Sequence, residues 1–356
     1  MALNLTRGGG PLIIAGPCSA ESCEQLLQTT RELASTGVVD VLRAGLWKPR
    51  TRPDSFEGVG ERGLAWLRQA KGECGLPIAT EVASARHAEL ALRAGVDLLW
   101  IGARTTVNPF LVQEIADAVS GSEATILVKN PMHPDLNLWG GAVERLERAG
   151  TPLEQIGLIH RGFSTYNHWH LRNDPMWHLV FEMQQRFPHL PILCDPSHIS
   201  GSREYLEEIA QTAANLNLDG LMIESHCTPK LALSDAEQQI TPLELKGLLG
   251  ALHWRVKQQG DEDYRRELSR YRNEIDQIDH EIFDLLSRRM EISDRIGEIK
   301  HKNEVIILQN ERWNEVVQRV IARADQLHLS QEFLRSILEA IHLESIAHQN
   351  RIKSRE

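Results

Sequence analysis

The chain has 356 residues, of which 42% are hydrophobic and 25% charged, and its formal net charge is -10. This balance is ordinary for a globular protein and argues against general affinity for nucleic acid or for an anionic membrane surface. No apolar run approaches the roughly 20 residues that span a bilayer. The five cysteines are odd in number and irregularly spaced, so we expect reduced thiols and a cytoplasmic location.

Residues 12–260 repeat a short apolar run followed by an amphipathic helical stretch. Continuous apolar runs of this kind are typical of buried parallel strands. About eight such units over roughly 250 residues predict an α/β fold, a (β/α)8 TIM barrel. The competing architecture is an open doubly wound sheet, but no GxGxxG motif follows the first run. The expected strands lie within 12–16, 39–45, 76–82, 97–103, 125–130, 156–162, 190–196 and 220–226.

The pattern changes near residue 262, where strand-like runs cease. Apolar residues then recur at spacings of three and four, which predicts a long amphipathic helix. Further helical segments follow near 310–325 and 331–353, so we expect an all-α, three-helix C-terminal domain. The polar stretch 258–263 is the expected linker, which gives domains 1–260 and 261–356. The apolar stripe of the first helix consists of Leu268, Tyr271, Ile275, Ile278, Ile282 and Leu285.

Positive charge concentrates at the C-terminal ends of the expected strands, where barrel enzymes place their chemistry. The stretch RAGLWKPRTR, residues 43–52, holds four cations and no acid although the whole chain is acidic. Like charges repel one another unless anions are expected between them, and arginine forks hold phosphates in a bidentate manner. The sequence therefore predicts a site for phosphorylated small molecules, formed by Arg43, Lys48, Arg50, Arg104, Lys129 and Arg161.

A second group of strand-end residues offers sulfur, nitrogen and oxygen ligands. In a closed barrel the last strand neighbours the first, so Cys18, His198 and Glu224 stand on three adjacent strands. Asp235 follows in the next loop. This mixture suits a divalent transition metal such as Mn, Fe, Co or Zn. His226 lies two residues beyond Glu224, and the pattern alone does not decide between the two.

Several short motifs follow the expected strands of the barrel half. They are GPCSAES (16–22), LRAGLWKPRTRPDSFEG (42–58), GAR (102–104), VKNP (128–131), HRGF (160–163), DPSHISG (195–201) and IESH (223–226). Together they resemble the type I-beta 3-deoxy-D-arabino-heptulosonate 7-phosphate (DAHP) synthase family over 12–245. The resemblance implies a metal-dependent condensation of phosphoenolpyruvate with erythrose 4-phosphate that releases phosphate. The alternative is a 3-deoxy-octulosonate 8-phosphate synthase whose helical tail serves only for dimerisation or ligand sensing.

The resemblance also assigns roles to individual residues of this sequence. It implies that Arg50, Thr51 and Ser197 meet the phosphate of erythrose 4-phosphate, while Lys129 and Glu81 are candidates for the proton transfers. It implies Glu224 and not His226 as a metal ligand. The full implied ligand set of the metal is Cys18, His198, Glu224 and Asp235, and phosphoenolpyruvate would be held by Arg43, Lys48, Arg104, Lys129 and Arg161.

Charged residues in the helical half have a spacing that fits a small dianion. Arg289 and Lys300 are eleven residues apart, so they share one helix face at a separation of about 16 Å. Arg272 precedes Lys300 by 28 residues, or about 42 Å along the same helix. Arg272 therefore reaches the same small ligand only from a partner subunit.

This half resembles the all-helical chorismate mutase family over 265–350. The resemblance implies rearrangement of chorismate to prephenate in sites shared by two intertwined chains, hence a homodimer or a larger homo-oligomer. Gln309 and Trp313 stand where many relatives carry acids. We also expect chorismate or prephenate to inhibit the barrel reaction through this domain. The implied substrate contacts are Arg272, Arg289, Arg312 and Ser345, with Lys300 and Gln349 donating to the ether oxygen.

Overall fold

The computed structural model describes residues 10–49, 55–166, 170–254, 262–306 and 310–352. The chain forms two compact units, Met1–Val256 and Lys257–Glu356. The boundary expected between 260 and 261 falls within 255–261, which lies outside the described residues.

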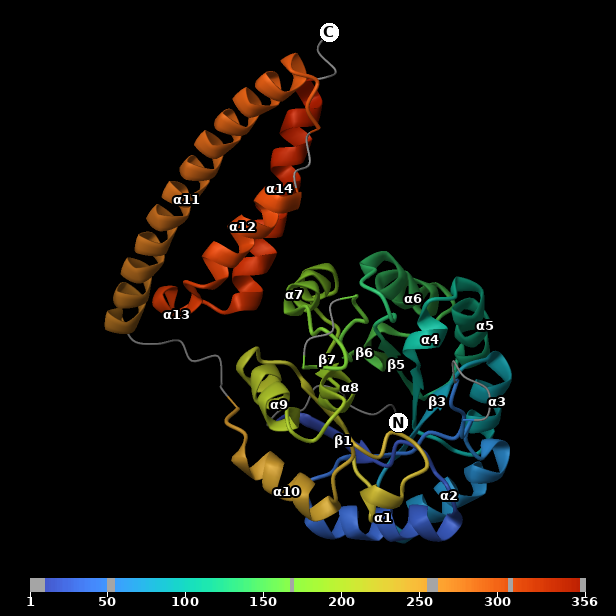
Figure 1. Ribbon diagram of the computed structural model, residues 1–356. Helices are drawn as coiled ribbons and strands as arrows, with labels where there is room; N and C mark the ends of the chain where they lie inside the picture. The colour runs from blue at the N-terminus through green and yellow to red at the C-terminus, as the bar shows by residue number, and fades with distance from the viewer. Residues whose placement is uncertain (1–9, 50–54, 167–169, 255–261, 307–309, 353–356) are drawn as a thin grey trace. The chain divides into compact units, whose positions relative to one another are not determined.

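The first unit is a closed barrel of parallel strands in the order β1 to β8, with β1 paired to both β2 and β8 (Figure 1). The barrel predicted from the apolar runs is thus confirmed, and the open sheet is excluded. The strands are buried along their length apart from the partly exposed Glu81 of β3, which explains why their sequences read as continuous apolar runs. The strands are β1 Leu12–Gly16, β2 Val41–Arg43, β3 Ile78–Val82, β4 Leu98–Ile101, β5 Thr125–Lys129, β6 Ile156–His160, β7 Ile192–Cys194 and β8 Gly220–Glu224.

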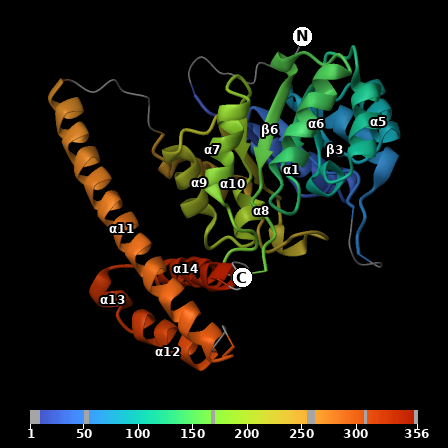
Figure 2. The ribbon, with the colours of Figure 1, turned by 90° about the horizontal axis from the view of Figure 1, so that it is seen from above.

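Helices surround the barrel and cover its outer face (Figures 1 and 2). Several begin at a polar cap. For example, Thr241 and Glu244 form a reciprocal capping box at the start of the last helix of the barrel unit, Pro242–Ala251. Short 3-10 turns lie at Gly60–Arg62 (η1), Leu153–Gln155 (η2) and Pro229–Leu231 (η3). The α-helices are α1 Cys23–Thr36, α2 Gly63–Cys74, α3 Ala85–Arg93, α4 Ala103–Thr106, α5 Pro109–Val119, α6 Leu136–Arg148, α7 Trp177–Arg186, α8 Pro196–Ser200, α9 Leu206–Asn215 and α10 Pro242–Ala251.

The core of the barrel unit has two layers that follow the alternation of side chains along each strand. In β1, Ile14 packs inside the barrel, while Ile13 and Ala15 pack outward against the helices. The interior is therefore filled by side chains and is not a pore, as is usual for this fold. The inner layer consists of Leu12, Ile14, Val41, Ala79, Leu98, Trp100, Leu127, Ile159, Leu193 and Met222.

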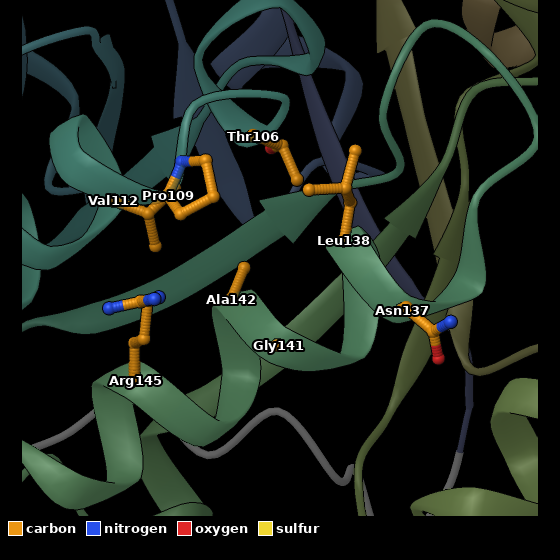
Figure 3. Close-up of a pocket in the computed structure, with 8 residues that line it drawn as sticks. All are labelled: Thr106, Pro109, Val112, Asn137, Leu138, Gly141, Ala142 and Arg145. Atoms are coloured by element: carbon orange, nitrogen blue, oxygen red, sulfur yellow. The ribbon is translucent and has the colours of Figure 1, made fainter.

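Helix α4 is tied to the barrel wall at its C-terminal rim. The buried Thr106 hydroxyl donates to the carbonyl oxygen of Lys129 at 2.9 Å, which links α4 to the end of β5. Beside this contact, a small pocket of about 120 Å³ is lined by residues of α5 and α6, among them Val112, Leu138 and Arg145 (Figure 3). The bond fixes the segment that carries Arg104 against the strand that carries Lys129.

The second unit consists of α11 Glu262–Lys302, α12 Asn310–Ile321, the short α13 Ala324–Leu327 and α14 Gln331–Ile352 (Figure 1). Both α11 and α12 pack against α14. Helix α11 has 41 residues and is about 61 Å long, whereas α14 has 22 and covers about 33 Å. The three-helix prediction is confirmed, with α13 as an additional short turn.

Strands β1 and β8 approach each other closely at Gly220. A Cβ atom at Gly220 would lie 2.1 Å from the carbonyl oxygen of Leu12, a distance that no side-chain rotation relieves. We expect Gly220→Ala to lower the free energy of unfolding by about 2 kcal/mol or more, because the barrel seam must open. Urea titration of the intact chain measures this loss.

Gly247→Ala provides a matched control for that substitution. Gly247 lies in α10 with nothing within 4 Å of its added Cβ atom. Alanine there should raise the unfolding free energy by roughly 0.5–1 kcal/mol, since glycine weakens a helix interior. Equal effects of the two substitutions would contradict the seam argument.

Candidate active sites

Side chains of opposite charge gather at the C-terminal ends of the barrel strands. Arg43 ends β2, Lys129 ends β5 and Glu224 ends β8, while Arg161 directly follows β6. Gly16 of β1 pairs with Glu224, which brings the loop carrying Cys18 beside β8. The parallel topology explains this convergence, because all the strands present their carboxyl ends at one rim.

Three of the four sequence-predicted metal ligands form a compact group. The Cys18 thiol donates to Asp235 Oδ2 at 3.1 Å. One ligand atom from each of Cys18, Glu224 and Asp235 lies within 4.8 Å of the other two. Burial, with a contribution from Glu224, raises the pKa of the Cys18 thiol to about 12. Sulfur and carboxylate donors this close fit a divalent transition metal.

The fourth predicted ligand, His198, stands beside this group. Its Nε2 lies 3.7 Å from Glu224 Oε1, and its Nδ1 lies 2.8 Å from Asp195 Oδ2. Burial lowers the pKa of His198, which favours the neutral imidazole. A ligating histidine usually has a carboxylate on its other ring nitrogen, and here Asp195 on Nδ1 leaves the Nε2 lone pair for a cation.

The structure places Glu224, and not His226, in the group of possible ligands. His226 Nδ1 accepts from the backbone N–H of Thr228 at 2.8 Å, and its Nε2 lies 3.8 Å from Glu21. Residues two apart point to the same side only within a strand. Because β8 ends at Glu224, this rule does not apply to His226.

Arg43 is fully buried and contacts Glu224 Oε1 at 3.1 Å through Nη2. Its guanidinium carbon also lies 4.9 Å from the ring centroid of Trp100. Within the part of the chain that the structure describes, Nε and Nη1 of Arg43 have no hydrogen-bond partner. Unsatisfied donors of a buried arginine are costly, so this residue retains capacity for an anion.

Lys129 and Arg161 are also buried at the rim. Lys129 Nζ lies 2.6 Å from Asp195 Oδ2, and Arg161 Nη1 donates to Asn173 Oδ1 at 2.8 Å. Burial lowers the pKa of Lys129, and it lowers the pKa of Arg161 to about 10. Burial opposes ionisation of Asp195, but His198 and Lys129 outweigh it and hold its pKa well below the usual range.

The remaining sequence-predicted residues of the rim have different surroundings. Lys48 is buried, whereas Arg104 on α4 is exposed. Ser197 is buried, and its hydroxyl accepts from the backbone N–H of Glu224 at 2.9 Å, so it braces β8. Glu81 lies against Gly102, where an added Cβ atom would meet Glu81 Oε1 at 2.0 Å. Arg50 and Thr51 lie outside the described residues.

Sequence reasoning missed several polar residues that hold the rim together. Asp195 contacts both Lys129 and His198. Arg172 Nη1 lies 3.0 Å from Asp235 Oδ1, and Gln239 Oε1 accepts from the backbone N–H of Cys18 at 2.9 Å. Asp195 is the first residue of the motif DPSHISG, so the motif could have indicated that it belongs to the site. Arg172 and Gln239 lie in loops, where no periodicity indicates their direction.

The helical unit contains a pocket of about 560 Å³ between α11, α12 and α14. Three cations line it, and none of the described lining residues is a carboxylate. Arg289 Nη1 donates to the hydroxyl of Ser345, and Gln349 Nε2 donates to Ser293 Oγ at 3.1 Å. The sequence-predicted residues that line the pocket are Arg289, Lys300, Arg312, Ser345 and Gln349, together with Trp313.

One predicted cation of the helical site stands apart from this pocket. Arg272 lies on the N-terminal half of α11, is exposed and does not line the pocket. Gln309 lies outside the described residues. Trp313 stacks on His342 with ring centroids 4.3 Å apart, so an aromatic pair forms one wall. Within one chain the pocket thus holds three of the four predicted cations.

Comparisons with known proteins agree with this division. Residues 4–260 match the DAHP synthetase I family, and residues 271–350 match chorismate mutase type II. A phospho-2-dehydro-3-deoxyheptonate aldolase of Thermotoga maritima is 34% identical over 233 residues, which cover 64% of each chain. The crystal structure of that aldolase from the same organism superposes with a TM-score of 0.61 at 32% identity, covering 69% of each chain.

A second group of relatives covers the barrel. A 2-dehydro-3-deoxyphosphooctonate aldolase of Helicobacter pylori is 29% identical over 279 residues, which cover 70% of this chain and 96% of the relative. In the described residues no helix is long and apolar enough to cross a membrane. The matched family region contains every strand of the barrel, and the chain therefore belongs to the DAHP synthetase I family, followed by a region of the chorismate mutase type II family.

Proposed function

We propose that the chain is a bifunctional enzyme with a condensing barrel, 1–260, and a mutase domain, 261–356. The barrel joins phosphoenolpyruvate to erythrose 4-phosphate to form DAHP and phosphate, and the mutase domain converts chorismate to prephenate. The observation that carries the first activity is the buried rim of Arg43, Lys129 and Arg161 beside the group of Cys18, Glu224 and Asp235. The match to the DAHP synthetase I family supports the same reaction.

The cations of the rim neutralise the two substrates. Together these bring about five negative charges at neutral pH, counting each phosphate as nearly two. Two such anions react only if the protein offsets their repulsion and holds them in contact. The groups proposed to hold phosphoenolpyruvate are Arg43, Lys48, Arg104, Lys129 and Arg161, and those proposed for the phosphate of erythrose 4-phosphate are Arg50, Thr51 and Ser197.

Cys18, His198, Glu224 and Asp235 would hold one divalent ion, of which Mn, Fe, Co and Zn all suit the donors. When bound, such an ion supplies Lewis-acid polarisation of the aldehyde oxygen. The protein itself orients the reacting carbons and moves protons. Lys129 is the better placed acid or base, because burial lowers its pKa toward neutrality and Asp195 holds its Nζ. Glu81 is the second candidate for proton transfer.

The helical pocket suits a pericyclic rearrangement, which needs neither nucleophile nor metal. Arg289 and Arg312 would hold the two carboxylates in the compact conformer, with Ser345 fixing the Arg289 guanidinium. Lys300 and Gln349 would donate to the ether oxygen, where negative charge grows in the transition state. The combination of lining cations with an absence of lining carboxylates among the described residues supports a dianionic ligand.

An exposed apolar stripe on α11 supports a homodimer through the helical domain. Tyr271, Ile275, Ile278 and Ile282 are 47%, 56%, 50% and 48% exposed in the single chain. Apolar residues at helical spacing with this exposure mark a surface that a partner covers. A second chain placed along α11 would bring Arg272 of the partner subunit to the pocket, as the 28-residue spacing requires.

The metal prediction is tested by chelation of the full-length protein. We expect exhaustive chelation to abolish condensation, added Mn²⁺ to restore it, and the mutase rate to stay constant because its pocket needs no cation. Phosphate release and chorismate absorbance follow the two reactions. Full condensation activity after chelation would remove the metal from the mechanism. Turnover with arabinose 5-phosphate in place of erythrose 4-phosphate would favour the octulosonate alternative.

The mutase assignment is tested by Arg289→Ala. Loss of this guanidinium should lower the mutase kcat/KM by roughly 100-fold or more, because it removes a charged contact to the transition state. Arg288→Ala is the matched control, since Arg288 is the preceding residue of α11, is exposed and does not line the pocket. If the helical domain serves only for dimerisation, the unchanged protein should show no chorismate turnover.

We expect feedback control of the barrel by the mutase ligands. Chorismate and prephenate lie downstream of the condensation product, so their binding is a suitable signal. Saturating prephenate should lower the condensation rate by a factor in the range of about 5 to 150, the usual size of an allosteric coupling. The effect should disappear in Arg289→Ala. Initial rates of condensation measured with and without prephenate test this coupling, and unchanged kinetics would refute it.

A further inference from the structure

A chain of hydrogen bonds connects the two carboxylates of the proposed metal site. Arg172, on the segment after β6, contacts Asp235 Oδ1 at 3.0 Å and Gln238 Oε1 at 2.8 Å through the same Nη1. Gln238 Nε2 in turn donates to Glu224 Oε2 at 2.6 Å. Asp235 and Glu224 are thus linked through one cation and one neutral amide.

The chemistry of the partners fixes the orientation of the Gln238 amide. Arginine has only donors, so it must face the amide oxygen, and an ionised carboxylate has only acceptors, so it must face the amide nitrogen. A flipped amide would oppose donor to donor and acceptor to acceptor. Gln238 is 1% exposed and Glu224 is fully buried, so water does not compensate for a wrong orientation.

Gln238 also completes the fixation of the Glu224 carboxylate. Arg43 contacts Oε1 at 3.1 Å, and Gln238 holds Oε2, so each oxygen has its own donor. His198 Nε2 lies 3.7 Å from Oε1, on the side of the proposed ligands. The plane of the carboxylate is therefore determined before any cation binds.

We propose that Gln238 is a positioning residue for the metal ligand Glu224, and that Arg172 orients the Gln238 amide while steadying Asp235. This inference rests on the proposed metal function of the barrel. Neither residue needs to touch the ion. Residues behind the ligands typically change metal affinity by 10- to 100-fold when they are removed.

The test is the affinity of the full-length protein for Mn²⁺, measured by calorimetry after chelation, in Gln238→Leu and Arg172→Lys. We expect Gln238→Leu to weaken binding about 10-fold or more, because the carboxylate loses its fixed orientation. Arg172→Lys keeps the positive charge but changes the position of the donor nitrogen, so it should weaken binding by a smaller factor. Circular dichroism verifies that each variant is folded at the temperature of the titration.

Arg203→Leu is the matched control. Arg203 anchors the same loop, with Nε donating to the carbonyl of Gln239 at 2.6 Å and Nη2 to that of Ala236 at 2.9 Å, but no described contact joins it to Glu224 or Asp235. We expect it to change the affinity by less than Gln238→Leu does. Equal losses in both variants would overturn the proposal in favour of general loop loosening.

The remaining outcomes separate this inference from the function on which it rests. No Mn²⁺ binding by the unchanged protein would refute the proposed metal site itself. Normal binding by the unchanged protein and by Gln238→Leu would refute only the positioning role. A raised KM for erythrose 4-phosphate in Arg172→Lys, with unchanged Mn²⁺ affinity, would indicate that Arg172 contacts the substrate. That result would overturn its proposed role in orienting Gln238 and steadying Asp235.

Discussion

The buried contact between Arg43 and Glu224 is the constraint on which the rest of the barrel rim depends. Both side chains are fully buried, and their atoms approach to 3.1 Å. Removing two charges from water costs several kcal/mol per ion, and their attraction offsets this only when geometry and hydrogen bonding are good. Gln238 completes the bonding of Glu224, whereas Arg43 keeps two donors without partners in the described structure. The hydrogen bonding of Arg43 is thus incomplete, and an anionic substrate would supply the missing acceptors.

The same principle explains why an acid stands behind Lys129, another buried cation of the rim. Lys129 is held by Asp195, which also contacts His198, so one buried carboxylate serves both the substrate side and the proposed metal side. Arg161 has a neutral partner, Asn173, and burial lowers its pKa to about 10. The rim is therefore a set of fixed charges of both signs and not simply a positive patch.

The sequence allowed the barrel and the positions of its strand-end residues to be predicted, because buried parallel strands read as continuous apolar runs. Cys18 and Glu224 could be placed together because a closed barrel makes β1 and β8 neighbours. The sequence did not indicate that the Ser197 hydroxyl accepts from the backbone N–H of Glu224. Loop residues such as Arg172 and Gln238 were missed because their direction depends on tertiary contacts that have no sequence period. In the helical half, spacing predicted the shared face of Arg289 and Lys300 but not the Trp313–His342 stack.

The two proposed sites handle anionic ligands by different means, and the difference follows from their scaffolds. In the barrel, β-strands bring acids and cations from distant parts of the chain to one rim, where Arg43 contacts Glu224 and Lys129 contacts Asp195. The helical pocket has no lining carboxylate among its described residues, and Arg289 is steadied there by a neutral hydroxyl. A dianion that binds the folded pocket and not the unfolded chain stabilises the folded state, so ligand binding should stabilise the helical unit. A domain whose stability depends on its ligand in this way has the property that a sensor of that ligand requires.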